Sequence, residues 1–130
     1  MNTTHTAHQH DDRLPVTERV LAALDELTEQ FSTIAAEAPD SNTAHALRAD
    51  RLATICARRV AWWNLLLTRR HRDGLSRLFV RAVIHAAGQE QDRARFWRDA
   101  AADWRARAER RPTSDVAGAM SNHHDLGIAS

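Results

Sequence analysis

The sequence predicts an all-α fold, a bundle of four helices with disordered N- and C-terminal tails. Apolar side chains recur at three- and four-residue spacings through the middle of the chain, the period of a helix with one buried face. The prolines stand at predicted element boundaries, and a hydrophobic fraction of 43% in 130 residues suffices for one compact core. We therefore divide the chain into a His-rich arm (1–13), a helical bundle domain (14–111) and a tail (112–130).

The first predicted helix begins between Leu14 and Thr17, where Pro15 suits an opening turn because its missing N–H needs no partner there. Pro39 ends this helix by disfavouring helical geometry at Ala38. Between these points, alternating steps of four and three residues place one apolar seam along a single face, the pattern of a coiled-coil contact. The seam contains Val20, Leu24, Leu27, Phe31, Ile34 and Ala38.

The second predicted helix follows a cluster of good N-cap residues at positions 40–43 and extends to about His71. Its apolar side chains cover more than half of the helical wheel, and small residues fill much of the rest. A helix that is apolar on so many sides is usually surrounded by other helices, so we expect it at the centre of the bundle. Burial on nearly every side would make it a scaffold and confine any activity to exposed arginines, seams or tails.

A turn at Asp73 and Gly74 precedes a third apolar helix over residues 75–86, for which Gly88 is the predicted stop. The apolar stripe of this helix contains Leu75, Leu78, Phe79, Ala82, Val83 and Ala86. The fourth helix, at about 89–111, is two-sided, with apolar residues on one face and Arg and Asp on the other. The alternative is one long helix that tolerates Gly88 at a cost of about 1 kcal/mol. That alternative gives a three-helix bundle.

Charge is distributed unevenly, although the net charge is +1. All 18 basic residues are Arg; residues 1–40 hold two of them against eight acids, whereas residues 41–111 hold sixteen against seven acids. If the first two helices form an antiparallel hairpin, Asp25, Glu26 and Glu29 lie near Arg58 and Arg59, and opposite charge favours that pairing. The alternative leaves the Arg face free for an anionic partner.

The basic residues of the second and third predicted helices form a candidate nucleic-acid-binding surface. Arg suits phosphate because its planar fork binds two oxygens at once, and a helix, a turn at 72–74 and a short helix could form a helix-turn-helix that presents Ser76. The same basic run also complements the dipole at the C-terminus of the second helix, which is a structural role. The candidate residues are Arg58, Arg59, Arg69, Arg70, Arg72, Arg77 and Arg81.

The tryptophans offer a second kind of interaction site. Trp62 and Trp63 are adjacent and point about 100° apart, so both cannot face the same neighbour. Either all four tryptophans are core, or some anchor a second protein, since Trp is enriched at interface hot spots. We expect a small non-enzymatic binding protein that contacts another protein or a second copy of itself. The candidate partner-binding residues are Leu24, Leu27, Phe31, Trp62, Trp97 and Trp104, with Leu126 and Ile128 in the tail.

Motifs for catalysis are lacking: we find no Gly-rich phosphate loop, nucleophile elbow or acid–base pair, so we expect neither an enzyme nor a cofactor. The two His clusters fall in predicted disordered tails without preformed geometry, so no metal site is expected. Cys56 is predicted to be a buried, unreactive thiol. No apolar run reaches the roughly 20 residues that span a bilayer, and the first 13 residues lack a signal peptide's apolar stretch. We therefore expect a cytoplasmic protein without membrane contact.

The last six residues, Asp125 to Ser130, read Asp-Leu-Gly-Ile-Ala-Ser. This segment resembles the C-terminal cargo-loading peptides by which proteins are packaged inside encapsulin nanocompartments, where a Leu-Gly-Ile type core follows a flexible linker. The resemblance implies that Leu126 and Ile128 enter pockets of the shell while Gly127 permits close backbone approach. Packaging as encapsulin cargo is therefore a further alternative function, beside nucleic-acid binding.

Overall fold

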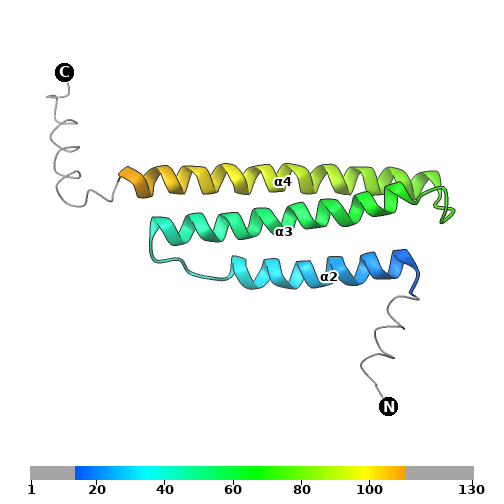
Figure 1. Ribbon diagram of the computed structural model, residues 1–130, viewed down its shortest axis with the longest axis horizontal. Coiled ribbons are helices and arrows are strands. Elements are labelled where there is room, and N and C mark those ends of the chain that lie inside the picture. The colour runs from blue at the N-terminus through cyan, green and yellow to red at the C-terminus, as the bar shows by residue number, and fades with distance from the viewer. Residues whose placement is uncertain (1–13, 111–130) are drawn as a thin grey trace, which may run out of the picture.

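The computed structural model describes residues 14–110, which form three helices and no strand. The chain runs along α2 (Val16–Ala35), returns along α3 (Asn42–Thr68) and reverses again into α4 (Arg77–Arg110). Figure 1 shows α3 between α2 and α4, with neighbouring helices antiparallel. The all-α prediction is confirmed, whereas the four-helix bundle is wrong and its three-helix alternative is correct. The predicted arm at 1–13 and tail at 112–130 lie outside the described residues.

The predicted third and fourth helices are one element because a seam of buried and half-buried positions continues past Gly88 without a break. Seam positions alternate in steps of three and four residues on both sides of this glycine, so the same face of α4 stays on the core. Apart from the neighbouring backbone of the helix itself, no atom lies within 4 Å of the position that a Cβ at Gly88 would take, so close packing does not require the glycine. Its cost of about 1 kcal/mol is smaller than the gain from burying the seam. The seam comprises Val80, Val83, Ala87, Glu90, Ala94, Trp97, Ala101, Trp104 and Ala108, all buried or half-buried.

The ends of α2 are set by a proline and by a side chain from α3. Pro15 precedes the first turn, and its carbonyl accepts hydrogen bonds from two N–H groups of that turn at 3.1 Å. At the other end, α2 stops at Ala35, three residues earlier than the seam predicts. Arg48 of α3 donates to the Ile34 carbonyl at 3.2 Å and to the Ala35 carbonyl at 2.5 Å. These bonds satisfy carbonyls that have no partner within the helix.

Both ends of α3 are capped by nearby residues. Ser41 is the N-cap, and its Oγ accepts the N–H three residues later at 3.0 Å. After Thr68 the chain makes one further turn and reaches Gly74, whose φ of 66° is a left-handed conformation that glycine adopts without strain. The Leu75 N–H then donates to the Arg70 carbonyl at 3.0 Å, which closes a Schellman-type turn. Gly74 thus lets the chain reverse into α4.

The core is narrow and consists largely of small side chains. Leu52 and Cys56 are completely buried in α3, and Val20, Leu66 and Val83 join the three helices in one cluster. Alanines occupy most other interior positions of α3 and α4, which lets these two helices pack closely along their length. The buried alanines are Ala46, Ala49, Ala53, Ala87, Ala94 and Ala101.

The prediction that the central helix is enclosed on nearly every side is wrong. Two helices pack against α3, and its remaining flank is exposed, with Leu47 at 59% and with Thr54, Arg58 and Ala61 also exposed. The neighbour that a four-helix bundle would place on this flank is absent from residues 14–110. Burial of α3 therefore gives no argument against catalysis, and a non-enzymatic role remains a prediction.

Candidate functional site

Arg59 and Glu90 form a buried ion pair that joins all three helices. Arg59 is 7% exposed, and its Nη1 lies 3.5 Å from Glu90 Oε2 in α4. On the α2 side, its Nη2 donates to Thr28 Oγ1 at 3.0 Å, and the guanidinium carbon lies 5.2 Å from the centroid of the Phe31 ring. Arg59 therefore does not belong to an exposed basic surface, and its predicted pairing with the acids of α2 is wrong. Its ion-pair partner comes from α4.

Cys56 lies beside this pair and is buried, as the sequence predicts. Burial raises the pKa of the thiol above its ordinary value of 9.0, and the Glu90 carboxylate raises that pKa further, while Arg59 and Arg93 oppose the shift. A thiol that stays protonated is a poor nucleophile, because the thiolate is the reactive form. The buried cluster therefore links helices and offers no activated group.

The apolar seam of α2 is used within the chain. Leu27 is buried, Leu24 is half-buried against the core cluster, and Phe31 meets Trp97 of α4 edge-on with ring centroids 6.3 Å apart. These contacts occupy the face on which we predicted a partner. The seam therefore supplies the contact between α2 and the α3–α4 hairpin, and little of it remains for a second protein.

The tryptophans fit neither of the two predicted roles completely, since all four are half-buried. Trp62 and Trp63 pack against the core cluster at the turn end of α3. Trp104 stacks on His45 of α3 with ring centroids 4.0 Å apart, and the Arg107 guanidinium carbon lies 4.6 Å from the Trp104 ring centroid. These indoles join helices while keeping part of each ring exposed. The other two predicted contacts, Leu126 and Ile128, lie outside the described residues.

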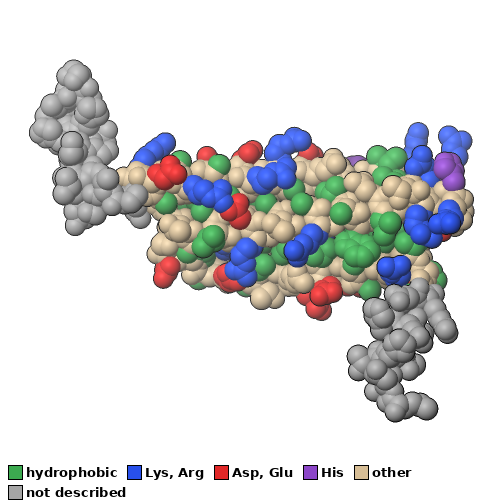
Figure 2. Space-filling view, in the orientation of Figure 1, with side chains coloured by type: hydrophobic (Ala, Val, Ile, Leu, Met, Phe, Trp, Pro, Cys, Tyr) green, Lys and Arg blue, Asp and Glu red, His purple; other side chains and the backbone are tan. Residues whose placement is uncertain are grey.

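Leu78, the most exposed large apolar side chain among residues 14–110, lies where α3 turns into α4, among several arginines. Leu78 is 79% exposed, Ile84 is 55% exposed and Phe79 is 43% exposed. Figure 2 shows basic side chains gathered at this end of the molecule, with hydrophobic side chains beside them. Together they define the turn-end surface, which comprises Arg70, His71, Arg72, Arg77, Leu78, Phe79, Arg81 and Ile84.

The positive charge of the turn-end surface is not balanced by nearby acids. Asp73 is the one acidic residue in positions 69–84, and it is engaged by Arg69, whose Nε lies 3.3 Å from Asp73 Oδ2. The four arginines of the turn-end surface have no carboxylate within 4 Å among residues 14–110. Arg69 is therefore neutralised locally, whereas the other four arginines have no carboxylate partner in the part of the chain that the structure describes.

A pocket of about 290 Å³ lies between the turn and the first turns of α4. Leu75 and Val80 supply its apolar lining, and the other lining residues are three arginines and one histidine. One of these groups is held close to the turn, because Arg70 Nη1 donates to the Leu67 carbonyl at 2.6 Å. We call this hollow the turn-end pocket; its lining is Arg70, His71, Leu75, Arg77, Val80 and Arg81.

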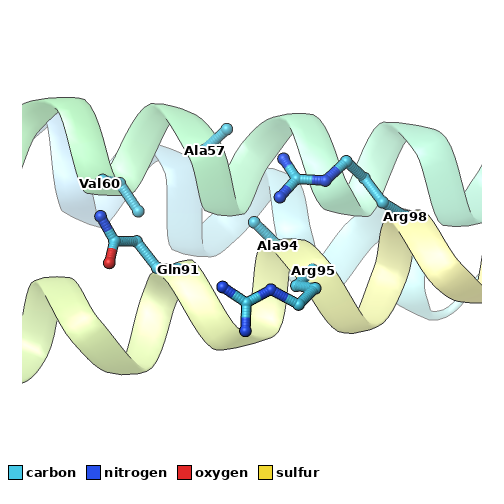
Figure 3. Close-up of a pocket in the computed structure, with 6 residues that line it drawn as sticks. All are labelled: Ala57, Val60, Gln91, Ala94, Arg95 and Arg98. Carbon is cyan, nitrogen blue, oxygen red and sulfur yellow. The ribbon is translucent and has the colours of Figure 1, made fainter.

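A second basic hollow of about 370 Å³ lies in the groove between α3 and α4, on the side away from α2 (Figure 3). Ala57 and Val60 line it from α3, and Arg95 and Arg98 border it from α4 together with Gln91 and Ala94. Arg95 lies 4.0 Å from the carboxylate of its neighbour Asp92. The apolar lining of the groove is two alanines and one valine, and one of its two arginines is paired locally, so it offers less positive charge to a partner than the turn-end pocket.

The predicted helix-turn-helix is not formed. That motif places two helices at about 90–120° across a short turn, so that the second can enter the major groove. Here α3 and α4 lie side by side and antiparallel, and α4 is 34 residues long (Figure 1). Ser76 instead directly precedes α4, where its Oγ accepts the Phe79 N–H at 3.1 Å.

No known protein family, curated protein or solved structure is matched by this chain. Within residues 14–110, no helix combines the length and apolar character needed to cross a bilayer. The same residues contain no group of three or more His, Cys, Asp or Glu arranged to hold a metal ion. Functional inference therefore rests on the geometry of the chain's own residues.

Sequence reasoning placed Leu78 and Phe79 in the apolar stripe of a short third helix and so missed their exposure. The missed signal is the register of the long helix, because the seam position Val80 fixes which face of α4 points inward. Measured from that seam at 100° per residue, Leu78 and Phe96 fall on the outward side. Both are among the most exposed large apolar side chains, at 79% and 62%.

Proposed function

We propose that this protein is a helical interaction protein that binds another protein through the turn-end surface. The single observation that carries the proposal is Leu78, 79% exposed and next to Phe79, among arginines without carboxylate partners in the described chain. Large apolar side chains in contact with water gain free energy when a partner covers them, at about 25 cal/mol per Å². Arg and aromatic residues are the types enriched at interface hot spots. The partner expected here carries acidic and apolar groups.

Two kinds of side chain at the turn-end surface would contribute to binding in different ways. Exposed arginines attract a negatively charged partner over a distance of about 10 Å at ordinary salt, which raises the association rate. Leu78, Phe79 and Ile84 then lose contact with water, which stabilises the complex after it has formed. Self-association is a less favoured form of this proposal, since two copies of the turn-end surface would bring like charges together.

The test compares Leu78→Ser/Phe79→Ser with a control, Leu47→Ser/Phe96→Ser, which removes one exposed leucine and one exposed phenylalanine away from the turn end. Affinity capture from the native host identifies the partner, and calorimetry then measures its affinity for each variant. We expect the turn-end variant to bind at least about tenfold more weakly, a change of 1.4 kcal/mol, while the control binds normally. A wild-type chain that sediments as a monomer and captures no partner would contradict the proposal.

Nucleic-acid binding is the second candidate, favoured by the clustering of Arg70, Arg72, Arg77 and Arg81 at one end of the bundle. Without helix-turn-helix geometry, contacts would be to phosphates and largely independent of sequence. A mobility shift with duplex DNA or RNA should then weaken steeply as salt rises. Replacement of the four arginines by Gln should abolish the shift, and an unchanged shift would refute this candidate.

Encapsulin packaging stays a prediction from the sequence alone, because residues 125–130 lie outside the described chain. Deletion of Leu126–Ser130 should prevent packaging when the protein is produced together with the shell protein of its host. Packaging that survives this deletion would remove the candidate. The helical domain plays no part in this test, so its result is independent of the turn-end surface.

A further inference from the structure

We infer that the turn-end pocket binds a phosphate group carried by a phosphorylated side chain of the protein partner. This inference rests on the proposed function and adds the chemistry by which the partner is recognised. It places the phosphate between Arg70, Arg77 and Arg81, with the partner's neighbouring residues over Leu78.

The residues that line the pocket carry more positive charge and more hydrogen-bond donors than one carboxylate can neutralise and satisfy. Three arginines and His71 line a hollow of about 290 Å³, and no Asp or Glu is among the lining residues. The nearest acid in the sequence, Asp73, is engaged by Arg69. A phosphate monoester carries a charge of about −1.5 to −2 and three strong acceptor oxygens, which match several Arg forks. A carboxylate has two oxygens and one charge, so it would leave donors unused.

The N-terminus of α4 adds to this positive potential. The helix begins at Arg77, and its first turn contains no acidic side chain that would offset the helix dipole. Arg77 and Arg81 are one turn apart, so they lie on one face of the helix, beside the pocket wall formed by Val80. The pocket therefore combines side-chain charges with the partial positive charge of a helix end.

The surroundings of the pocket favour a phosphorylated protein over a nucleic acid. Three arginines line one hollow of limited volume, which suits a single phosphate better than a line of backbone phosphates. Leu78 and Ile84, 79% and 55% exposed, adjoin the basic cluster. A phosphodiester backbone offers no apolar groups to cover them, whereas a peptide brings such side chains on either side of its phosphorylated residue.

The experiment titrates the full ¹⁵N-labelled chain with N-acetyl-phosphoserine amide and, separately, with the serine and glutamate analogues. We expect amide shifts confined to residues 69–84 with phosphoserine, binding at least about tenfold weaker with glutamate, and none with serine. Arg77→Gln/Arg81→Gln should weaken phosphoserine binding by about tenfold or more. The matched control is Arg95→Gln/Arg98→Gln, which removes the same charge from the α3–α4 groove and should leave affinity within about twofold.

Three outcomes would overturn the phosphate inference. One is equal binding of the glutamate and phosphoserine analogues. Another is an equal loss of phosphoserine affinity in Arg77→Gln/Arg81→Gln and Arg95→Gln/Arg98→Gln, which would indicate general attraction of anions. The third is saturable binding of duplex DNA at residues 69–84 without binding of phosphoserine.

The two proposals can fail separately. If Leu78→Ser/Phe79→Ser abolishes partner binding while phosphoserine does not bind, the phosphate site fails and the proposed function stands. If phosphoserine binds but the apolar variant still holds its partner, the proposed role of Leu78 and Phe79 fails instead.

Discussion

The two ends of the α3–α4 hairpin use arginine in opposite ways. At the end away from the turn, Arg48 holds the last carbonyls of α2, Arg51 pairs with Glu37 at 2.9 Å, and Arg105 pairs with Asp50 across the hairpin. At the turn end, four arginines lack a carboxylate within 4 Å among residues 14–110. The same residue type therefore connects helices at one end and remains available at the other.

This difference shows that an excess of arginine over a long segment does not locate a binding surface. Residues 41–111 are basic throughout, yet acids lie near the arginines at one end and are scarce at the other. The distribution of acids between the ends decides where positive potential remains. Arg59, between the two ends, adds a third use, because it is buried and paired with Glu90.

The largest expected effect tests that buried pair. Glu90→Leu removes the carboxylate from Arg59 and leaves a buried charge without its ionic partner, so we expect a loss of about 3 kcal/mol in the free energy of unfolding. Urea denaturation measures this value. The control is Asp92→Ala, in the same helix, which removes a carboxylate that is 79% exposed and should cost no more than about 0.5 kcal/mol.

The double variant Arg59→Met/Glu90→Leu distinguishes an uncompensated charge from lost packing. Replacing both partners by apolar side chains should recover most of the stability that Glu90→Leu loses, because no buried charge then remains. Failure of the double variant to recover would show that the Thr28 and Phe31 contacts of Arg59, and not its charge balance, hold the helices together.

The next largest effect comes from replacing arginines at the two ends of the α3–α4 hairpin and comparing the losses of stability. Arg48→Gln removes two charge-assisted hydrogen bonds to the end of α2, so we expect a cost of about 1.5 kcal/mol. Arg77→Gln/Arg81→Gln should change stability by less than about 0.5 kcal/mol, because these side chains make no ion pair in the described chain. Equal losses in urea titrations of the two variants would remove the distinction between a structural end and a binding end.

The same substitution at the two glycines of the α3–α4 hairpin, Gly74 and Gly88, should change the free energy of unfolding in opposite directions. Gly74→Ala introduces a Cβ at φ 66° and should cost about 1 kcal/mol, which would loosen the turn that carries the turn-end surface. Gly88→Ala meets open space in a continuous helix and should add about 1 kcal/mol. Thermal or urea unfolding of both variants provides the measurement. Destabilisation by Gly88→Ala would mean that α4 needs a flexible point after all.

The smallest effect concerns pH and the buried thiol. The chain has no Lys and no Tyr, so Cys56 is the side chain expected to titrate between about pH 8 and 11. The pKa of the thiol is raised in the folded chain, so the fold favours the protonated form. The stability that comes from this preference is fully present well below pH 9.0 and is lost as the pH rises above that value. At pH 9.0 half of the thiol is ionised in the unfolded chain, which lowers the free energy of unfolding by about 0.4 kcal/mol.

Cys56→Ala provides the control for this pH dependence. The substitution changes the packing of the core at every pH, so the relevant quantity is the slope of stability between pH 8 and 10 and not its absolute value. We expect a shallower slope in the variant than in the wild-type chain. Equal slopes would show that the thiol does not account for the alkaline loss.

Much of the local structure was predictable from short-range signals. Pro15, the N-cap cluster around Ser41 and the Asp73–Gly74 turn correctly marked helix boundaries, because capping and turn formation depend on neighbouring residues. Gly88 misled the prediction, because its cost of about 1 kcal/mol is outweighed by a seam that spans the whole of α4. The exposure of Leu78 was missed for the same reason, since the register of that seam decides which side chains face outward.

By itself, the sequence determined an all-helical chain, the apolar seam of α2, a buried Cys56 and a basic second half. The tertiary structure decided which arginines have a carboxylate partner within residues 14–110 and which do not. Arg59 finds Glu90 thirty-one residues away, and Arg105 finds Asp50 across the hairpin, pairings that exist only once α3 and α4 have packed in one register. A guanidinium is neutralised by whatever carboxylate the fold brings within about 4 Å, and that distance depends on packing between helices and not on position along the chain.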